Sequence, residues 1–185
     1  MTPAKFVQCA AFMVALALLT SCAPRKTAFT SGTIEGDRYR NNSIGMRMNL
    51  PAVWAYDAIP KRIFDDNCMS SRLFYAKYEP SGGDFVYASI DCLLIPDKRN
   101  MQGVANLKKV LKEGSCEGEV KVTIGQNDFA MDSLNKEAGG INFTQLGYSM
   151  HKDNYTLLFV GQFSRETEKA VFKKALETLS FSTTP

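Results

Sequence analysis

The start of this 185-residue chain carries one apolar stretch, Phe6–Leu19, in which Gln8 is the only uncharged polar residue. As a helix, these fourteen residues would reach roughly 21 Å at about 1.5 Å per residue. That length falls short of the roughly 30 Å hydrocarbon core of a bilayer, so a permanent transmembrane helix is disfavoured. Lys5 before the stretch and small residues after it complete the three parts of a secretory signal. We therefore predict that residues 1–21 are a signal peptide and that the folded domain is built from the chain that follows.

The end of this stretch, Leu19-Thr20-Ser21-Cys22, resembles the lipobox of bacterial lipoproteins. The resemblance implies that the Cys22 thiol receives diacylglycerol, that the signal is cut before Cys22, and that the new amino terminus is acylated, for example with palmitate. Each buried methylene contributes about 0.8 kcal/mol, so two or three chains anchor a protein firmly to a membrane. Because Ala23 rather than Asp follows, the pattern of Gram-negative enteric bacteria implies an outer-membrane location facing the periplasm.

The rest of the chain has the composition of one ordinary folded domain. Residues 22–37 contain few large apolar residues, and we predict that they form a flexible tether. Residues 38–182 are predicted to be a single domain, large enough to bury a core without cross-links. The formal net charge of only +3 gives no electrostatic reason to expect nucleic acid as a partner.

Alternation of apolar and polar residues predicts most of the secondary structure. Turn residues between two pairs of alternating segments predict hairpins. A change in the apolar phase between Phe143 and Leu146 predicts a bulge near Thr144 or Gln145. The predicted strands are Ile44–Leu50, Arg72–Tyr78 returning into Phe85–Ile95, Val120–Ile124, a weaker strand at Phe129–Leu134, and Ile141–Met150 returning into Tyr155–Phe163.

Two segments have helical spacing instead. Val104, Leu107 and Leu111 place one apolar stripe on residues 100–113. A second stripe lies on the final helix, for which Ser164 is the predicted N-cap; its members are Phe172, Ala175, Leu176 and Leu179. The order of elements predicts an α+β fold, a largely antiparallel twisted sheet with helices packed on it.

Several short motifs resemble the PsbP/Mog1-like (DcrB-like) superfamily. They are Tyr39–Gly45 leading into the first strand, Leu50-Pro51 with nearby Trp54, and the ending Phe172–Phe181 after the last hairpin. The resemblance implies an α/β/α sandwich over residues 38–182 and usually no enzymatic activity. It carries over no catalytic residue, because the superfamily has none in common.

The residues themselves offer little chemistry. His151 is the only histidine, and we interpret it as a solvated turn residue without a catalytic or metal-binding partner. We therefore predict no catalytic site, no cofactor and no metal site. An exported chain meets oxidising conditions, so one disulfide is permitted. We predict that it involves Cys68, with Cys92 as partner, while Cys116 remains a competing partner for either.

These observations predict a lipid-anchored, non-enzymatic envelope lipoprotein. Its partners would be the membrane, through the lipid on Cys22, and an unknown envelope protein that it binds or helps to assemble. The alternative is a periplasmic carrier or sensor of a small apolar ligand held between the sheet and one helix. An apolar pocket of about 300 Å³ or more would favour the carrier. A filled core with an exposed aromatic patch would favour the interaction module.

Overall fold

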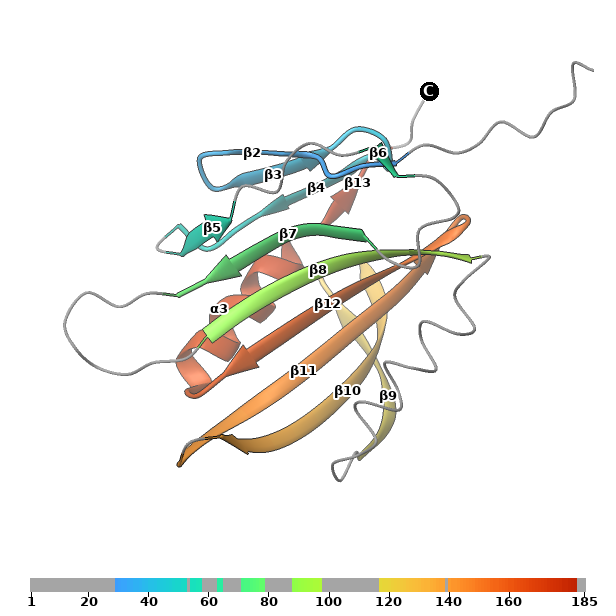
Figure 1. Ribbon diagram of the computed structural model, residues 1–185. Helices are drawn as coiled ribbons and strands as arrows, with labels where there is room; N and C mark the ends of the chain where they lie inside the picture. Colours follow the sequence, from blue (N-terminus) through green and yellow to red (C-terminus); the bar gives the residue numbers. More distant parts are fainter. Residues whose placement is uncertain are drawn as a thin grey trace, which may run out of the picture.

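The computed structural model describes residues 29–52, 54–57, 63–64, 71–78, 88–97, 117–138 and 140–182. Its largest element is a seven-stranded sheet in which every neighbouring pair is antiparallel (Figure 1). In spatial order the strands are β5 (Ala55–Asp57), β7 (Ser71–Lys77), β8 (Ala88–Pro96), β12 (Tyr155–Phe163), β11 (Ile141–Lys152), β10 (Asn127–Ala138) and β9 (Glu117–Ile124).

A second, smaller sheet and one helix lie against one face of this sheet (Figure 1). The helix is α3 (Glu166–Glu177), which follows β12 directly. The smaller sheet has four antiparallel strands in the order β13 (Ser180–Phe181), β4 (Met46–Asn49), β3 (Arg38–Asn41) and β2 (Thr33–Glu35). A two-stranded pair joins β1 (Phe29–Thr30) to β6 (Ile63–Phe64).

The core lies between these two layers and is rich in aromatic side chains. The Tyr148 ring packs edge-on against Phe172 of α3, with ring centroids 5.7 Å apart, and against Phe129 at 6.0 Å. From the smaller sheet, the Tyr39 ring packs at a tilt against Phe74, with ring centroids 4.8 Å apart. Each of these five side chains is at most 2% exposed. The apolar residues that alternate along the strands thus fill the space between the two layers.

The predicted α+β class is confirmed as a β-rich fold of mostly antiparallel strands, with both predicted hairpins present as β7–β8 and β11–β12. The finer prediction of a helix-packed sandwich is not matched by the described residues, in which one helix covers one face. The helix predicted at 100–113 lies outside them.

Three local predictions are wrong. Residues 29–30 and 33–35, inside the predicted tether 22–37, form β1 and β2, because Phe29 is buried in the core at 1% exposure. No bulge occurs at Thr144 or Gln145, since β11 keeps one continuous register with each neighbour. The N-cap of α3 is Arg165 rather than Ser164, and it makes no side-chain capping bond.

The apolar phase shift in β11 has a different cause. This strand lies inside the sheet. Its consecutive residues Gln145–Tyr148 point alternately to the two faces, and all four are buried. An interior strand with two covered faces need not alternate strictly. The switch from Phe143 to Leu146 therefore reflects a change in which face carries the apolar side chain.

Candidate functional site

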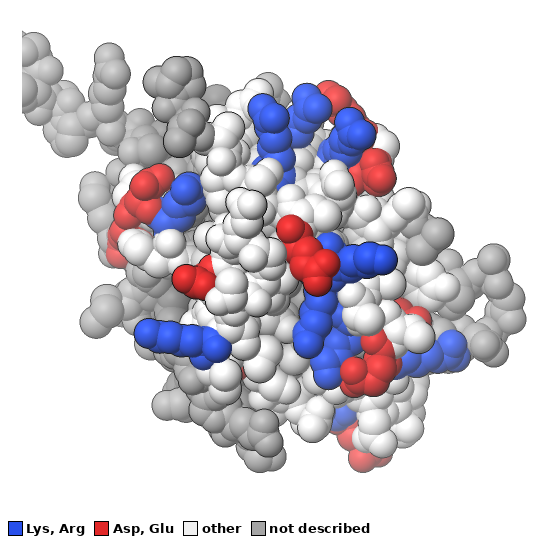
Figure 2. All heavy atoms as spheres, turned by 180° about the vertical axis from the view of Figure 1, so that it is seen from behind, with Lys and Arg blue, Asp and Glu red and all other residues white. Residues whose placement is uncertain are grey.

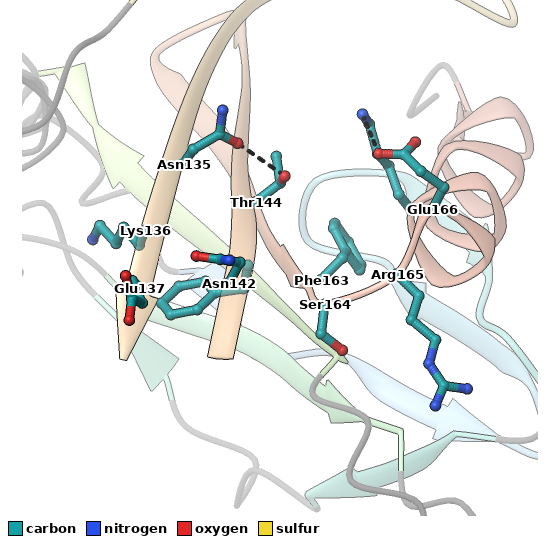
Figure 3. Close-up of a pocket in the computed structure, with 11 residues that line it drawn as sticks. Asn135, Lys136, Glu137, Asn142, Thr144, Phe163, Ser164, Arg165 and Glu166 are labelled. Carbon is teal, nitrogen blue, oxygen red and sulfur yellow. Dashed lines mark hydrogen bonds and ion pairs between the residues drawn. The ribbon is translucent and has the colours of Figure 1, made fainter. Parts of the chain in front are cut away.

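A pocket of about 470 Å³ opens between the β10–β11 hairpin and the start of α3 (Figure 3). One wall is formed by the paired ends of the two strands, and the other by the chain that leaves β12 and enters the helix. Its lining residues are Asn135, Lys136, Glu137, Asn142, Phe143, Thr144, Phe163, Ser164, Arg165, Glu166 and Lys169.

Strand pairing sets the first wall. Asn135 pairs with Thr144, and Thr144 pairs in turn with Phe163 of β12. Residues paired across an antiparallel ladder point to the same face. The Thr144 hydroxyl donates a hydrogen bond to Asn135 Oδ1 at 3.0 Å, which joins these two side chains across the strands (Figure 3). The polar groups of this wall are therefore held by the sheet rather than by a loop.

The second wall begins where β12 ends. Phe163 is buried at 2% exposure, and its ring lies 5.4 Å from that of Phe172 on α3. This contact anchors the turn that brings Arg165 and Glu166 to the pocket (Figure 3). The first turn of a helix carries unsatisfied backbone N–H groups and a partial positive charge. The start of α3 therefore makes the electrostatic potential along this wall more positive.

Charges of both signs meet in the pocket. Lys169 Nζ lies 3.1 Å from Glu166 Oε1, in an ion pair within the first turns of α3. Lys136 Nζ donates a hydrogen bond to Gln145 Oε1 at 3.2 Å, and the same oxygen accepts one from Gln162 Nε2 at 3.0 Å. Three cationic and two anionic side chains line the pocket in all. Such a mixture fits a polar partner that presents both donors and acceptors.

The pocket contains no histidine or cysteine. Within the described ranges, no group of three or more His, Cys, Asp and Glu side chains is placed to hold a metal ion. His151 lies on β11 instead, with Nδ1 3.5 Å from Asp97 Oδ1, and its side chain is 58% exposed. The turn beyond it is Asp153-Asn154, where Asp153 takes a φ of 53° that aspartate tolerates.

The residues singled out in the sequence are not brought together at this pocket. Cys22 and Cys68 lie outside the described residues. Cys92 lies on β8 with a free thiol and 0% exposure, and burial followed by the charge of Asp91 raises the pKa of that thiol well above its ordinary value. The predicted Cys68–Cys92 disulfide stays a prediction.

Sequence reasoning missed the pocket itself. The one signal that pointed toward it was the phase shift in β11, because Phe143 stands on the face opposite to Leu146. The residues of the pocket come from four consecutive elements, β10, β11, β12 and α3, and the pairing of β10 with β11 and of β11 with β12 brings them together.

Comparison with known proteins assigns no family. No family model matches the chain, and no curated protein matches it. Among the helices of the described residues, none is long and apolar enough to span a membrane.

Several solved structures are similar at low identity. A protein from Bacteroides thetaiotaomicron VPI-5482 has a TM-score of 0.49 and 16% identity, over 81% of this chain and 50% of the other. The chain thus spans about half the length of that protein. LpqN of Mycobacterium tuberculosis, a protein involved in cell envelope biogenesis, has a TM-score of 0.41 and 12% identity, over 72% of this chain and 78% of its own.

A protein of unknown function from Pseudomonas aeruginosa, PA94, has a TM-score of 0.42 and 11% identity, over 71% of this chain and 99% of the other. All three TM-scores are below 0.5. The resemblance to PsbP/Mog1-like proteins therefore stays a prediction.

Proposed function

We propose that this chain is a lipid-anchored, non-enzymatic lipoprotein of the cell envelope, whose domain binds another envelope protein or supports an assembly. The observation that carries the proposal is Leu19-Thr20-Ser21-Cys22, placed at the end of an apolar stretch of export length. A thiol at that position is where bacterial lipoproteins of this pattern receive their lipid.

The pocket supports a binding role of a particular kind. Nine of its eleven lining residues are polar or charged, and only Phe143 and Phe163 are apolar. A carrier of an apolar ligand would be expected to surround it with apolar side chains. The size of the pocket satisfies the expectation for a carrier, but its lining does not. We therefore favour a polar partner, such as a segment of another protein, over a small apolar ligand.

The other expected sign of an interaction module, an exposed aromatic patch, has no counterpart in the described residues. The large apolar side chains exposed among them are Val120 at 48% and Val171 at 38%. The proposed contact therefore depends on the polar pocket.

The anchor is tested by replacing one cysteine. Cys22→Ala should abolish incorporation of labelled palmitate and leave the uncleaved precursor in the membrane fraction. Cys9→Ala is the matched control, because Cys9 belongs to the segment that is removed. Normal acylation and cleavage of the Cys22→Ala protein would refute the anchor.

The binding role is tested in the native envelope by photocrosslinking. A photoreactive residue at Asn142, which lines the pocket and is exposed, should capture a defined partner protein. The same residue at Gln126, exposed in the turn between β9 and β10, is the control. Identical crosslinks at both positions, or a co-purified apolar molecule identified by mass spectrometry with no protein crosslink, would contradict the proposal.

A further inference from the structure

The outer face of the four-stranded sheet carries a row of arginines. Along β3 and β4 the buried side chains alternate with exposed ones. The exposed set comprises Arg38, Arg40, Arg47 and Asn49, and we call it the arginine face. Seen from behind, several basic side chains stand at the top of the molecule, where Figure 1 places this sheet, with acidic side chains beside them (Figure 2).

Two of these arginines face each other directly. Arg40 of β3 and Arg47 of β4 are register partners, so their Cβ atoms lie about 5 Å apart, and like charges at that position destabilise a sheet. Neither forms an ion pair within the part of the chain that the structure describes. The acidic Glu35 of β2 is the register partner of Arg38, at the start of β3, and not of Arg40. Folding alone gives no reason to place Arg40 and Arg47 side by side, whereas binding of an anionic partner does.

The arginine pair lies beside the point where the chain enters the domain. Asn41, next to Arg40, donates a hydrogen bond from Nδ2 to the Thr30 carbonyl at 2.6 Å. The Thr30 amide donates in turn to Ser43 Oγ at 3.0 Å, in the turn that joins β3 to β4. Residues 29–30 are therefore fixed to the end of the sheet that carries the pair.

The link from this end to the lipid is short. Six residues, 23–28, separate Cys22 from Phe29, and seven steps of extended chain span at most about 25 Å. The domain itself has a radius of gyration of roughly 15 Å for about 150 residues. A body of that size on so short a link lies close to the bilayer. The linking residues include Arg25 and Lys26 and no acidic residue.

We infer that the arginine face docks on the anionic lipid headgroups of the membrane that holds the anchor. The inference rests on the proposed function, because the acylated Cys22 brings this face to the bilayer. Each arginine near an anionic surface favours the docked state by a factor of roughly five, so Arg40 and Arg47, which have no acidic register partner, favour it by about twenty-fivefold. The attraction extends over about 10 Å at 0.1 M salt and is weakened by more salt.

The test uses the mature protein purified from cell membranes, with its mass measured first to count acyl chains. The protein is placed in vesicles of phosphatidylcholine alone or with one quarter phosphatidylglycerol, and its arginines are modified with phenylglyoxal. Arg40 and Arg47 should react at least fivefold more slowly in the anionic vesicles at low salt, and equally in both at high salt. Arg72, exposed on β7 of the other sheet, should react alike in both.

Charge reversal supplies the second arm. Arg47→Glu should abolish the protection of Arg40, while removing a like-charge pair and so preserving the fold. Lys121→Glu, an equal reversal at an exposed site on β9, should leave that protection unchanged. Acylated protein whose Arg40 reacts equally in both vesicles would overturn the docking. Protein without acyl chains would overturn the proposed function, and this inference with it.

Discussion

Gly161 is the position where one methyl group should disturb the packing most. It lies on β12, opposite Leu146 of β11 and Ile90 of β8. A Cβ atom built on it would lie 2.7 Å from Cε1 of Phe172 and closer still to the ring of Phe163. Ordinary carbon contacts are about 3.5–4.0 Å. Gly161→Ala must therefore displace the two rings that hold α3 against the sheet.

The magnitude follows from these contacts. Inserting a methyl group into a packed core costs typically about 1–3 kcal/mol. The pair formed by Phe163 and Phe172, with centroids 5.4 Å apart, contributes about 0.5–1.5 kcal/mol beyond burial, and part of it is lost when the rings separate. We expect Gly161→Ala to lower the free energy of unfolding by about 2–4 kcal/mol. In a domain of this size the melting temperature falls by roughly 2–4 °C per kcal/mol.

Urea denaturation followed by circular dichroism measures this change, and a double-mutant cycle identifies its cause. With Phe163→Leu as the background, the nearer of the two rings is gone while the Phe172 ring remains, so Gly161→Ala should cost less than in the wild type by about 1 kcal/mol or more. An equal cost in both backgrounds would refute the steric argument, and the smaller backbone entropy of the unfolded alanine chain could not explain it, because that effect stabilises the fold. Because Phe163 also lines the pocket, Gly161→Ala should in addition weaken the crosslinking seen from Asn142.

Three further predictions concern buried polar groups. Tyr39→Phe should destabilise the domain by about 1–3 kcal/mol in urea titrations, because the Tyr39 hydroxyl donates to the Ser31 carbonyl at 2.9 Å and accepts from Asn41 at 3.1 Å; an unchanged midpoint would contradict this. Burial raises the pKa of Tyr39 above its ordinary 10.0, so as the pH rises the unfolded chain loses this proton before the folded chain does. The contribution of Tyr39 to the free energy of unfolding should therefore be fully present below pH 10 and decrease above it, and in Tyr39→Phe the free energy of unfolding should fall less steeply. Burial should protect Cys92 from iodoacetamide in the native state; after denaturation, labelling without reductant would refute the predicted disulfide to Cys68, and labelling only after reduction would support it.

The sequence predicted those elements whose signals are local. Strict alternation around Met46 and Met48 indicated β4, and the aromatic and turn residues before Phe85 indicated the hairpin of β7 and β8. The apolar stripe containing Phe172 and Leu176 indicated α3, and both residues are 0% exposed. Each of these signals repeats within a few residues, so a single sequence contains it in full.

Features that depend on strand register, or on side chains from another layer, were beyond such reasoning. Phe29 looked like part of a tether because its neighbours are small and polar, yet its ring packs edge-on against Tyr155 at 5.6 Å. The pocket depends on a strand register that places Asn135 opposite Thr144. The Arg40–Arg47 pair likewise exists only because β3 and β4 pair in one register, and no local period indicates that two charges will meet.

Helix α3 connects the two surfaces argued to be functional. Its first turn borders the pocket, and beyond its last turn the Thr178 hydroxyl accepts a hydrogen bond from the Asn49 amide of β4 at 2.9 Å. Twelve helical residues span roughly 18 Å, so the pocket and the four-stranded sheet lie at opposite ends of a rigid rod. With the arginine face on the bilayer, this rod would hold the pocket away from the lipid, where a partner protein has access to it. Docking would then do more than add affinity to an anchored protein, because it would fix the direction in which the pocket faces.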